Sequence, residues 1–351
     1  MAFLSIPNAA IAGISACVPK QEEFCSDFPL FSEEESLNFS KTTGVISRRV
    51  ASPEMCSSDL CLHAADKLLS DMQWDREEID CLVFVTQTPD YHLPATSPLL
   101  QKRLGLSENC LALDISLGCS GFVYGLGVIT SLLSHGNIRK GLLLAGDTIS
   151  KTCSKNDKTT YPLFGDAGSA TALEFQGGGR DFLFNLKTDG SGSNVIKIED
   201  GGFRNPTNYD SLKEIKIDEG ISRNKLQLIL EGMDVFTFGI SKAPASIKEL
   251  SEHFELNLES VDDFIFHQAN KFMNEKIRKK LNLPVEKVPY SIERFGNTSC
   301  ATIPLTMVTE MRDKLENNRL SHIACGFGVG LSWGSVYFET NKIVVSDLVE
   351  I

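Results

Sequence analysis

The chain lacks the cysteine patterns of disulfide scaffolds and metal sites. Ten cysteines are spread over 351 residues, yet no CxxC pair and no metal-ligand spacing occurs among them. Most of these cysteines stand in apolar surroundings. We therefore expect free thiols in a reducing compartment and no bound metal.

Positive charge is scarce as well. Lys and Arg number 34 against 46 Asp and Glu, which gives a formal net charge of −12. This balance disfavours non-specific binding to nucleic acid or to an anionic membrane, although a local basic patch could still recruit an acidic partner.

Long apolar runs and export signals are absent too. No run approaches the ~20 residues that cross a bilayer. Residues 1–20 have no basic segment before their apolar part, unlike a signal peptide, and residues 11–19 instead predict a first strand. We expect a cytoplasmic protein.

The glycine-punctuated segment 164–170, FGDAGSA, matches neither GxGxxG nor GxxxxGK[ST]. It is therefore not expected to cradle a nucleotide phosphate. The chain as a whole is 42% hydrophobic and 23% charged, which is the composition of an ordinary globular protein with one large or two medium domains.

The most informative stretch runs from Leu111 to Leu133. An apolar run of strand length, 111–115, breaks at Leu117-Gly118, and a helix-length apolar segment follows from Ser120. Cys119 stands at this turn, where unpaired N–H groups and the helix dipole are expected to lower its thiol pKa and favour the nucleophilic thiolate. The alternative is that Cys119 is only a small buried hydrophobe.

The rest of the chain alternates strands with helices and then repeats itself, which predicts an α/β protein of two similar halves. We expect an N-terminal half at 1–176 and a C-terminal half at 177–351, in which the Gly-, Asp- and Asn-rich segment 177–223 forms a connector with hairpins. The expected strands are 79–86, 111–115, 141–146, 171–175, 261–266 and 320–325, and the expected helices are 57–72, 94–104, 120–133, 235–254 and 301–315.

Two polar motifs should meet Cys119 where the halves join. His267 directly follows the buried strand 261–266, and Asn297 stands at a second elbow, equivalent to that of Cys119. Strand ends and topological joins are where α/β sheets gather ligands. Taken singly, His267 could be a core histidine, and 295–299 could be a turn with an N-cap.

Together these segments resemble the thiolase superfamily, and within it the β-ketoacyl-ACP synthase III group. The matching motifs are DISLGCSGF around Cys119, FGDAGSA at 164–170, HQAN at 267–270, FGNTS at 295–299 and GFGVGLSWG at 326–334. The resemblance runs in order over nearly the whole chain. It implies a thiolase-like fold of two pseudo-duplicated halves in α-β-α-β-α layers.

The resemblance also implies a reaction. Cys119 would accept an acyl group from an acyl-CoA or acyl-ACP thioester. His267 and Asn297 would bind the thioester carbonyl of malonyl-ACP while CO₂ leaves, giving a β-ketoacyl-ACP. Backbone N–H groups of Cys119 and Val329 would form the oxyanion hole, and no metal or organic cofactor would be needed.

The outer residues depart from the family pattern. Asn38 replaces a tryptophan that stacks on the CoA adenine, Thr42 and Lys158 replace nearby arginines, and Phe272, beside Lys271, replaces a basic residue that docks the carrier protein. The expected thioester- and carrier-facing rim is thus altered, which puts acetyl-CoA in doubt as the acyl donor.

Leu93 matches an aromatic residue that closes the acyl pocket across the dimer in the family. We therefore expect a homodimer in which a smaller gate admits a longer or branched acyl group.

Two other functions stay open at this point. The same acyl-Cys119 could pass its acyl group to an O, N or S acceptor, as the altered rim suggests. Alternatively, the chain could be a non-catalytic partner of a related condensing enzyme, although such subunits usually lose part of the triad that is intact here.

Overall fold

The computed structural model describes residues 2–351, which form two large β-sheets. The first sheet has the order β17-β2-β8-β7-β5-β6, and β18 also pairs with β2. Its strands are β2 (Ala9–Val18), β5 (Cys81–Val85), β6 (Leu111–Ile115), β7 (Lys140–Asp147), β8 (Ala167–Phe175), β17 (Val344–Val345) and β18 (Val349–Glu350). β7, β5 and β6 are parallel, whereas β8 runs antiparallel to both of its neighbours.

The second sheet has the order β1-β9-β16-β15-β14. Its strands are β1 (Ala2–Ile6), β9 (Phe182–Thr188), β14 (Asp263–Phe266), β15 (Arg319–Gly328) and β16 (Ser332–Asn341). Only the pair β14–β15 is parallel. Three small pairs lie outside both sheets, namely β3 (Glu22–Phe24) with β4 (Ser47–Arg49), β10 (Ile196–Lys197) with β13 (Ile229–Leu230), and β11 (Ile215–Asp218) with β12 (Ile221–Arg223).

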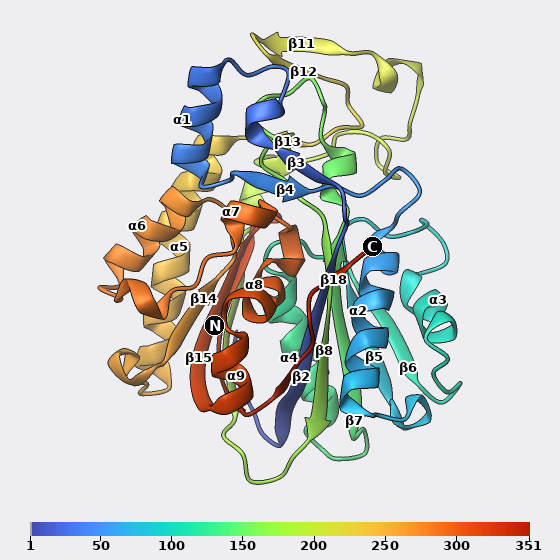
Figure 1. Cartoon of the computed structure of the whole chain (residues 1–351), viewed down its shortest axis with the longest axis vertical. Helices are drawn as coiled ribbons and strands as arrows, with labels where there is room; N and C mark the ends of the chain where they lie inside the picture. The colour runs from blue at the N-terminus through green and yellow to red at the C-terminus, as the bar shows by residue number, and fades with distance from the viewer. Residues whose placement is uncertain (1) are drawn as a thin grey trace.

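Helices separate and cover the two sheets, so that the molecule has five layers (Figure 1). α4 and α8 lie between the sheets, α2 and α3 cover the outer face of the first, and α5, with α6 against it, covers the second. The helices are α1 (Glu33–Thr43), α2 (Ser57–Met72), α3 (Thr96–Arg103), α4 (Gly121–Leu133), α5 (Gly232–His253), α6 (Lys271–Lys280), α7 (Ile292–Phe295), α8 (Thr302–Glu310) and α9 (Arg312–Asn317).

The ends of the chain cross between the two halves. β1 pairs antiparallel with β9 in the second sheet, and β17 and β18 pair with β2 in the first. Each sheet therefore contains strands from both sides of residue 176, and the halves are tied together by main-chain hydrogen bonds.

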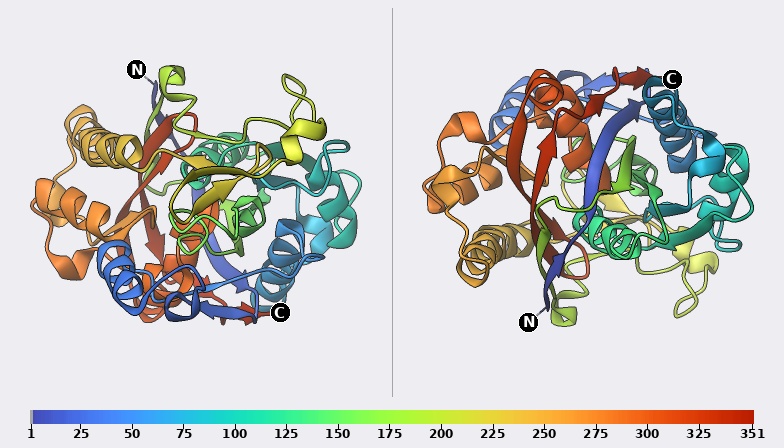
Figure 2. Two further views of the ribbon diagram at one scale, coloured as in Figure 1. Left: turned by 90° about the horizontal axis from the view of Figure 1, so that it is seen from above. Right: turned by 90° about the horizontal axis from the view of Figure 1, so that it is seen from below.

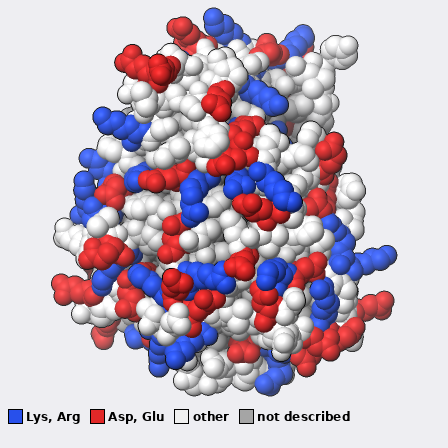
Figure 3. Space-filling view, viewed as in Figure 1, with Lys and Arg blue, Asp and Glu red and all other residues white. Residues whose placement is uncertain are grey.

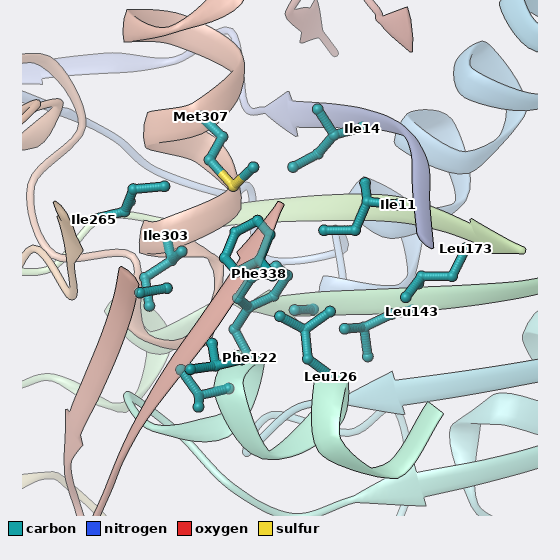
Figure 4. Packing of buried hydrophobic residues seen from close by; sticks show 14 of the residues in the cluster. Ile11, Ile14, Phe122, Leu126, Leu143, Leu173, Ile265, Ile303, Met307 and Phe338 are labelled. Atoms are coloured by element: carbon teal, nitrogen blue, oxygen red, sulfur yellow. The ribbon is translucent and has the colours of Figure 1, made fainter. Parts of the chain in front are cut away.

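The largest core cluster fills the space between the sheets (Figure 4). Burial of one such Leu, Ile or Phe side chain contributes about 1.5–3 kcal/mol. The side chains labelled there come from the five strands β2, β7, β8, β14 and β16 and from the helices α4 and α8: Ile11, Ile14, Leu143, Leu173, Ile265, Phe338, Phe122, Leu126, Ile303 and Met307.

Local sequence signals account for most element boundaries. α2 spans Ser57–Met72, as the apolar spacing predicts, and it begins where the Asp59 carboxylate accepts the Cys56 N–H at 2.7 Å. The helix expected at 301–315 is instead broken, because α8 ends at Glu310 and α9 restarts at Arg312.

The connector is more structured than its composition predicts. β9 lies within it and is a full strand of the second sheet. The rest carries the pair β11–β12 and the strand β10, which pairs with β13 just after the connector. Seen from above, this region lies over the middle of the molecule (Figure 2).

Acidic and basic side chains are interspersed on the face of the molecule in Figure 3. Among residues 2–351, none of the helices is both long and apolar enough to span a bilayer. Within the same residues, no group of three or more His, Cys, Asp or Glu side chains is arranged to hold a metal ion.

Candidate active site

A cavity of about 730 Å³ opens where the two halves and the connector meet. Its walls are mainly apolar, with polar groups gathered around Cys119. The N-terminal half contributes Thr43, Gln87, Cys119, Ile149, Thr152, Thr159, Leu163 and Phe164; the connector contributes Ile196, Lys197, Ile198, Ile217, Ile221 and Arg223; and the remaining wall is formed by Leu228, Leu230, Glu231, Gly232, Met233, Val235, Phe236, His267, Ala269, Asn270, Met273, Asn297, Ser299, Phe327, Gly328 and Val329.

Cys119 stands in the turn between β6 and α4, two residues before the helix begins. The end of β15 packs directly on this turn. A Cβ on Gly326 would lie 2.9 Å from the Cys119 carbonyl oxygen, and one on Gly328 would lie 2.6 Å from the Cys119 Cβ. Glycine at these two positions therefore lets the backbone of the second half reach the thiol.

The prediction that the turn lowers the pKa of the Cys119 thiol is wrong. Burial, with a smaller contribution from the Asp147 carboxylate, raises the pKa of the Cys119 thiol to about 12. The N–H groups of Val329 and of Cys119 itself, together with the Ser299 hydroxyl, lower the pKa as a strand-to-helix turn should, but they offset only part of the desolvation. The resting thiol is therefore protonated at neutral pH.

Alkylation of Cys119 by iodoacetamide should consequently accelerate with pH. Because the thiol pKa is about 12, the thiolate fraction and the rate are expected to rise about tenfold per pH unit from pH 7 to 10 without levelling off. Peptide mass mapping of timed reactions measures this rate. A rate for Cys119 that is already constant above pH 7 would contradict the burial-dominated pKa.

His267 directly follows β14 and is buried. Its Nδ1 lies 2.8 Å from the Thr302 hydroxyl, which in turn lies 3.1 Å from the Ser299 carbonyl oxygen. The hydroxyl can accept from Nδ1–H while donating to Ser299, or it can donate to Nδ1. Both neutral tautomers of the imidazole thus have a partner.

Burial also sets the charge of His267. Desolvation lowers the pKa of its imidazole to about 3, and the bond to the Ser299 carbonyl offsets only part of the shift. The ring of Phe327 stands edge-on to the imidazole, with centroids 5.5 Å apart, and helps to exclude water. At neutral pH the imidazole is uncharged.

Asn297 is held by main-chain pairing across the two halves. Its N–H donates to the Leu163 carbonyl at 2.9 Å, and its carbonyl accepts from the Gly165 N–H at 3.1 Å. The FGDAGSA segment therefore positions this residue. The Asn297 Oδ1 accepts the Ser299 N–H at 3.0 Å, which leaves the Nδ2 group as a free donor.

The turn after β15 presents the Val329 N–H to the Cys119 thiol. The Ser332 hydroxyl donates to the Val329 carbonyl at 2.8 Å, and it lies 2.6 Å from the Ser120 hydroxyl. Two serines, one from each half, thus fix the turn relative to α4.

Replacing Gly328 with alanine should impair acylation of Cys119. The new Cβ would lie 2.9 Å from the Cys119 Sγ, and overpacking of this kind costs about 1–3 kcal/mol, or roughly 5- to 150-fold in rate. Gly177→Ala, at a position with no atom within 4 Å of the new Cβ, is the matched control. Single-turnover acylation measures both variants; equal rates for Gly328→Ala and the control would contradict this close packing.

The predicted site residues fall into two groups. Cys119, His267, Asn297 and Val329 line one cavity, whereas none of the expected rim and gate residues lines it. The latter are Leu93, Asn38, Thr42, Lys158, Lys271 and Phe272.

Phe272 is next to the cavity, whereas Lys158 and Lys271 form ion pairs with residues outside the lining. Phe272 stacks on Phe236, a cavity residue, at 5.7 Å between centroids. Lys158 pairs with Glu35 at 3.1 Å, and Lys271 pairs with Glu293.

The other three are exposed to solvent. Asn38 and Thr42 are exposed on α1, and Leu93 is 82% exposed in the loop before α3.

Several residues that shape the site had no recognisable signal in the sequence. Thr302 and Ser299 hold His267 and Asn297, but both read as ordinary residues of a helix start. Arg223 lies in a connector strand of three residues, and its place in the cavity depends on a long-range contact with residues 154–158.

Comparison with known proteins adds independent information. The family model described as 3-oxoacyl-[acyl-carrier-protein] synthase III matches residues 113–190, and the model of the C-terminal part of that family matches residues 251–340. The first range contains Cys119, and the second contains His267, Asn297 and Val329.

The relatives match this chain over nearly the whole length of each protein. A β-ketoacyl-[acyl-carrier-protein] synthase III of Caldanaerobacter subterraneus is 31% identical over 95% of this chain and 98% of its own. A 3-oxoacyl-(acyl-carrier protein) synthase of Burkholderia xenovorans has a solved structure with a TM-score of 0.93 at 38% identity, over 100% of this chain and 99% of that one. The corresponding synthase III of Pseudomonas aeruginosa gives 0.83 at 29% identity, over 96% and 99%. The predicted thiolase-like α/β fold is confirmed.

Proposed function

Because the chain belongs to the 3-oxoacyl-[acyl-carrier-protein] synthase III family, we propose that Cys119 takes an acyl group from a thioester and transfers it to malonyl-ACP. One observation carries this proposal. A thiol, a neutral imidazole and a free amide donor, from Cys119, His267 and Asn297, line the same largely apolar cavity.

Acyl loading begins with a protonated thiol. The proton of the Cys119 thiol passes to the Nε2 of neutral His267, and sulfur attacks the thioester carbonyl. The donor's thiol leaves and takes that proton from His267. The N–H groups of Cys119 and Val329 receive the developing oxyanion, a contribution of about 3–4 kcal/mol for such donors.

Condensation uses His267 and Asn297 as hydrogen-bond donors. The Asn297 Nδ2 group and the His267 Nε2–H bind the thioester carbonyl of malonyl-ACP, which stabilises the enolate formed as CO₂ leaves. The enolate carbon attacks the acyl-Cys119 carbonyl, and Cys119 departs as a thiolate. A β-ketoacyl-ACP is released, and the thiolate takes up a proton because its pKa is high.

Thr302 suits a histidine that serves both steps. Loading needs a lone pair on His267 Nε2, and condensation needs a proton there. One hydroxyl that lies between Nδ1 and the Ser299 carbonyl can support either tautomer by rotating. These steps require only hydrogen-bond donors and a nucleophile, both of which the chain itself supplies. We therefore propose that no metal or organic cofactor takes part.

The acceptor is proposed to arrive on acyl carrier protein in the cytoplasm. The last turn of α6 carries Arg278, Lys279 and Lys280, and these cations suit an acidic partner. The ten free cysteines are in keeping with a reducing compartment.

We also propose a homodimer formed through the edge of the first sheet. β6 is its edge strand, and Leu111 on it is 41% exposed. Nearby loops expose Leu93 and Tyr91 (61%), and His92 contacts Phe203 (91% exposed) edge to face at 6.4 Å. An apolar edge strand needs a cover, and a second copy would supply it.

Sedimentation should therefore give a dimer of 38.6-kDa chains. Lys in place of Leu111 puts a charge on the paired edge and is expected to shift the protein towards monomer, whereas Leu37→Lys, at an exposed site on α1, should not. A wild-type protein that sediments as an active monomer would contradict the proposed pairing. Leu93 would lie at this edge, as a gate to the partner's acyl pocket.

Product analysis with a panel of acyl-CoA and acyl-ACP donors tests the function. With malonyl-ACP, the wild type should release CO₂ and form a β-ketoacyl-ACP. Acylation of Cys119 without CO₂ release would instead indicate transfer to an O, N or S acceptor. Loading of acetyl alone would remove the proposal that the small Leu93 side chain admits longer or branched acyl groups.

A further inference from the structure

An arginine lies in the mainly apolar wall of the cavity. Arg223 ends β12, its side chain is only 14% exposed, and it lines the cavity that holds Cys119. The other charged groups of the lining are Lys197 and Glu231. A guanidinium removed from water at such a place requires anionic partners.

Asp157 supplies only part of that requirement. Its fully buried Oδ2 lies 3.4 Å from one terminal nitrogen of Arg223, while its Oδ1 accepts the Thr159 N–H at 2.8 Å and the Thr159 hydroxyl at 2.5 Å. Among residues 2–351, the guanidinium has no second hydrogen-bond partner. Four of its five N–H donors are therefore available to a ligand.

The strand that carries Arg223 is firmly attached. The Ser222 N–H donates to the Asn156 carbonyl at 2.8 Å, and the Ser154 hydroxyl donates to the Ser222 carbonyl at 2.6 Å. Ile221 forms a bridge with Asp157. The guanidinium is thus held on a fixed support rather than on a free hairpin.

The described lining of the cavity holds no second guanidinium, and its other cation, Lys197, donates to the Asn194 Oδ1 at 3.2 Å. Asn38 and Thr42 are uncharged and exposed, and Lys158 lies outside the lining and pairs with Glu35. Arg223 is therefore the guanidinium that a donor extending from Cys119 along the cavity would meet.

We propose that Arg223 binds the phosphate of the donor's phosphopantetheine arm. This inference rests on the proposed function, because it takes the ligand to be an acyl thioester. The arms of acyl-CoA and acyl-ACP both carry this phosphate at the end remote from the thioester. A planar guanidinium with free N–H donors binds phosphate in a bidentate manner. Asp157 positions the Arg223 guanidinium while occupying only one of its N–H donors.

Acyl loading with three donors tests the inference. One acyl group, the one that the wild type loads best, is supplied on CoA, on acyl carrier protein and on N-acetylcysteamine, which ends before the phosphate. Intact-protein mass spectrometry gives kcat/KM for acylation of Cys119. The variants are Arg223→Gln, Asp157→Asn and the double variant Arg223→Gln/Asp157→Asn, in which no buried carboxylate is left unpaired.

Arg223→Gln and the double variant should lower kcat/KM by about 10- to 100-fold for phosphate-containing donors, the usual effect of losing a charged hydrogen bond. The N-acetylcysteamine thioester should be loaded by every variant as by the wild type. Asp157→Asn, which removes the carboxylate that positions Arg223, should lower kcat/KM for the phosphate-containing donors by less than Arg223→Gln does. Arg204→Gln, at an exposed arginine of the same connector, controls for net charge. A loss confined to CoA or to the carrier protein supports the inference and identifies the source of the phosphate.

Two results would overturn it. Equal losses on all three donors would show that Arg223 only maintains the fold, and no loss on any donor would show that the phosphate binds elsewhere. A folded wild type that none of the donors acylates would overturn the proposed function, and this inference with it.

Discussion

Replacing Cys119 with alanine is expected to abolish the acyl-enzyme and to lower condensation by at least about 10⁴-fold, as loss of a covalent nucleophile does in other enzymes. No other thiol can substitute for it. Among the described residues, Cys119 is the cysteine that lines the cavity, and burial raises the pKa of the neighbouring Cys300 thiol well above its usual value. Intact-protein mass after exposure to acyl thioesters, with product analysis, measures both effects.

Cys110→Ala is the matched control. Cys110 is half-buried and lies outside the cavity, just before β6, so its removal should change neither the adduct nor the rate. An acyl adduct that persists in Cys119→Ala and disappears in Cys110→Ala would place the nucleophile elsewhere.

Replacing Asn297 with alanine is expected to separate the two half-reactions. Its Nδ2 donor is proposed to bind the enolate oxygen, so condensation should fall by about 10²- to 10³-fold, the usual effect of removing one such donor. Loading should stay within a few-fold of wild type, because the Cys119 and Val329 N–H groups serve that step. Single-turnover loading and CO₂ release measure the two rates.

Asn297→Asp distinguishes the donor from its structural role. The Asn297 Oδ1 accepts the Ser299 N–H, and aspartate keeps this acceptor while it loses the Nδ2 donor. Both variants should therefore lose condensation. An Asp variant with wild-type condensation, or an Ala variant with an equal loss of loading, would contradict the assigned role.

The sequence predicted those parts of the fold that depend on short-range pattern. Ser57–Met72 and Leu111–Ile115 were predicted with their observed bounds, since apolar spacing and turn residues determine them locally. His267 and Asn297 could be placed near Cys119 because one follows a buried strand and the other opens an equivalent elbow.

Such local patterns could not predict features that depend on contacts between distant parts of the chain. The pairing of β1 with β9 joins segments about 180 residues apart in the chain, and nothing in either segment specifies the other. The Cys119 pKa depends on how completely the surrounding walls exclude water, which no local motif records. Likewise, Arg223 reads as one more charged residue of a polar connector until the fold carries it to the cavity.

A single-turnover chase of the acylated enzyme tests whether acyl-Cys119 is the intermediate of a carbon–carbon bond-forming reaction. Enzyme acylated in advance and freed of donor is mixed with malonyl-ACP, and the adduct on Cys119, the CO₂ and the β-ketoacyl-ACP are followed together. One equivalent of CO₂ and one of β-ketoacyl-ACP are expected to appear as the adduct disappears, at a single rate. An adduct that remains while CO₂ is released, or that disappears without a β-ketoacyl-ACP, would contradict this role of acyl-Cys119.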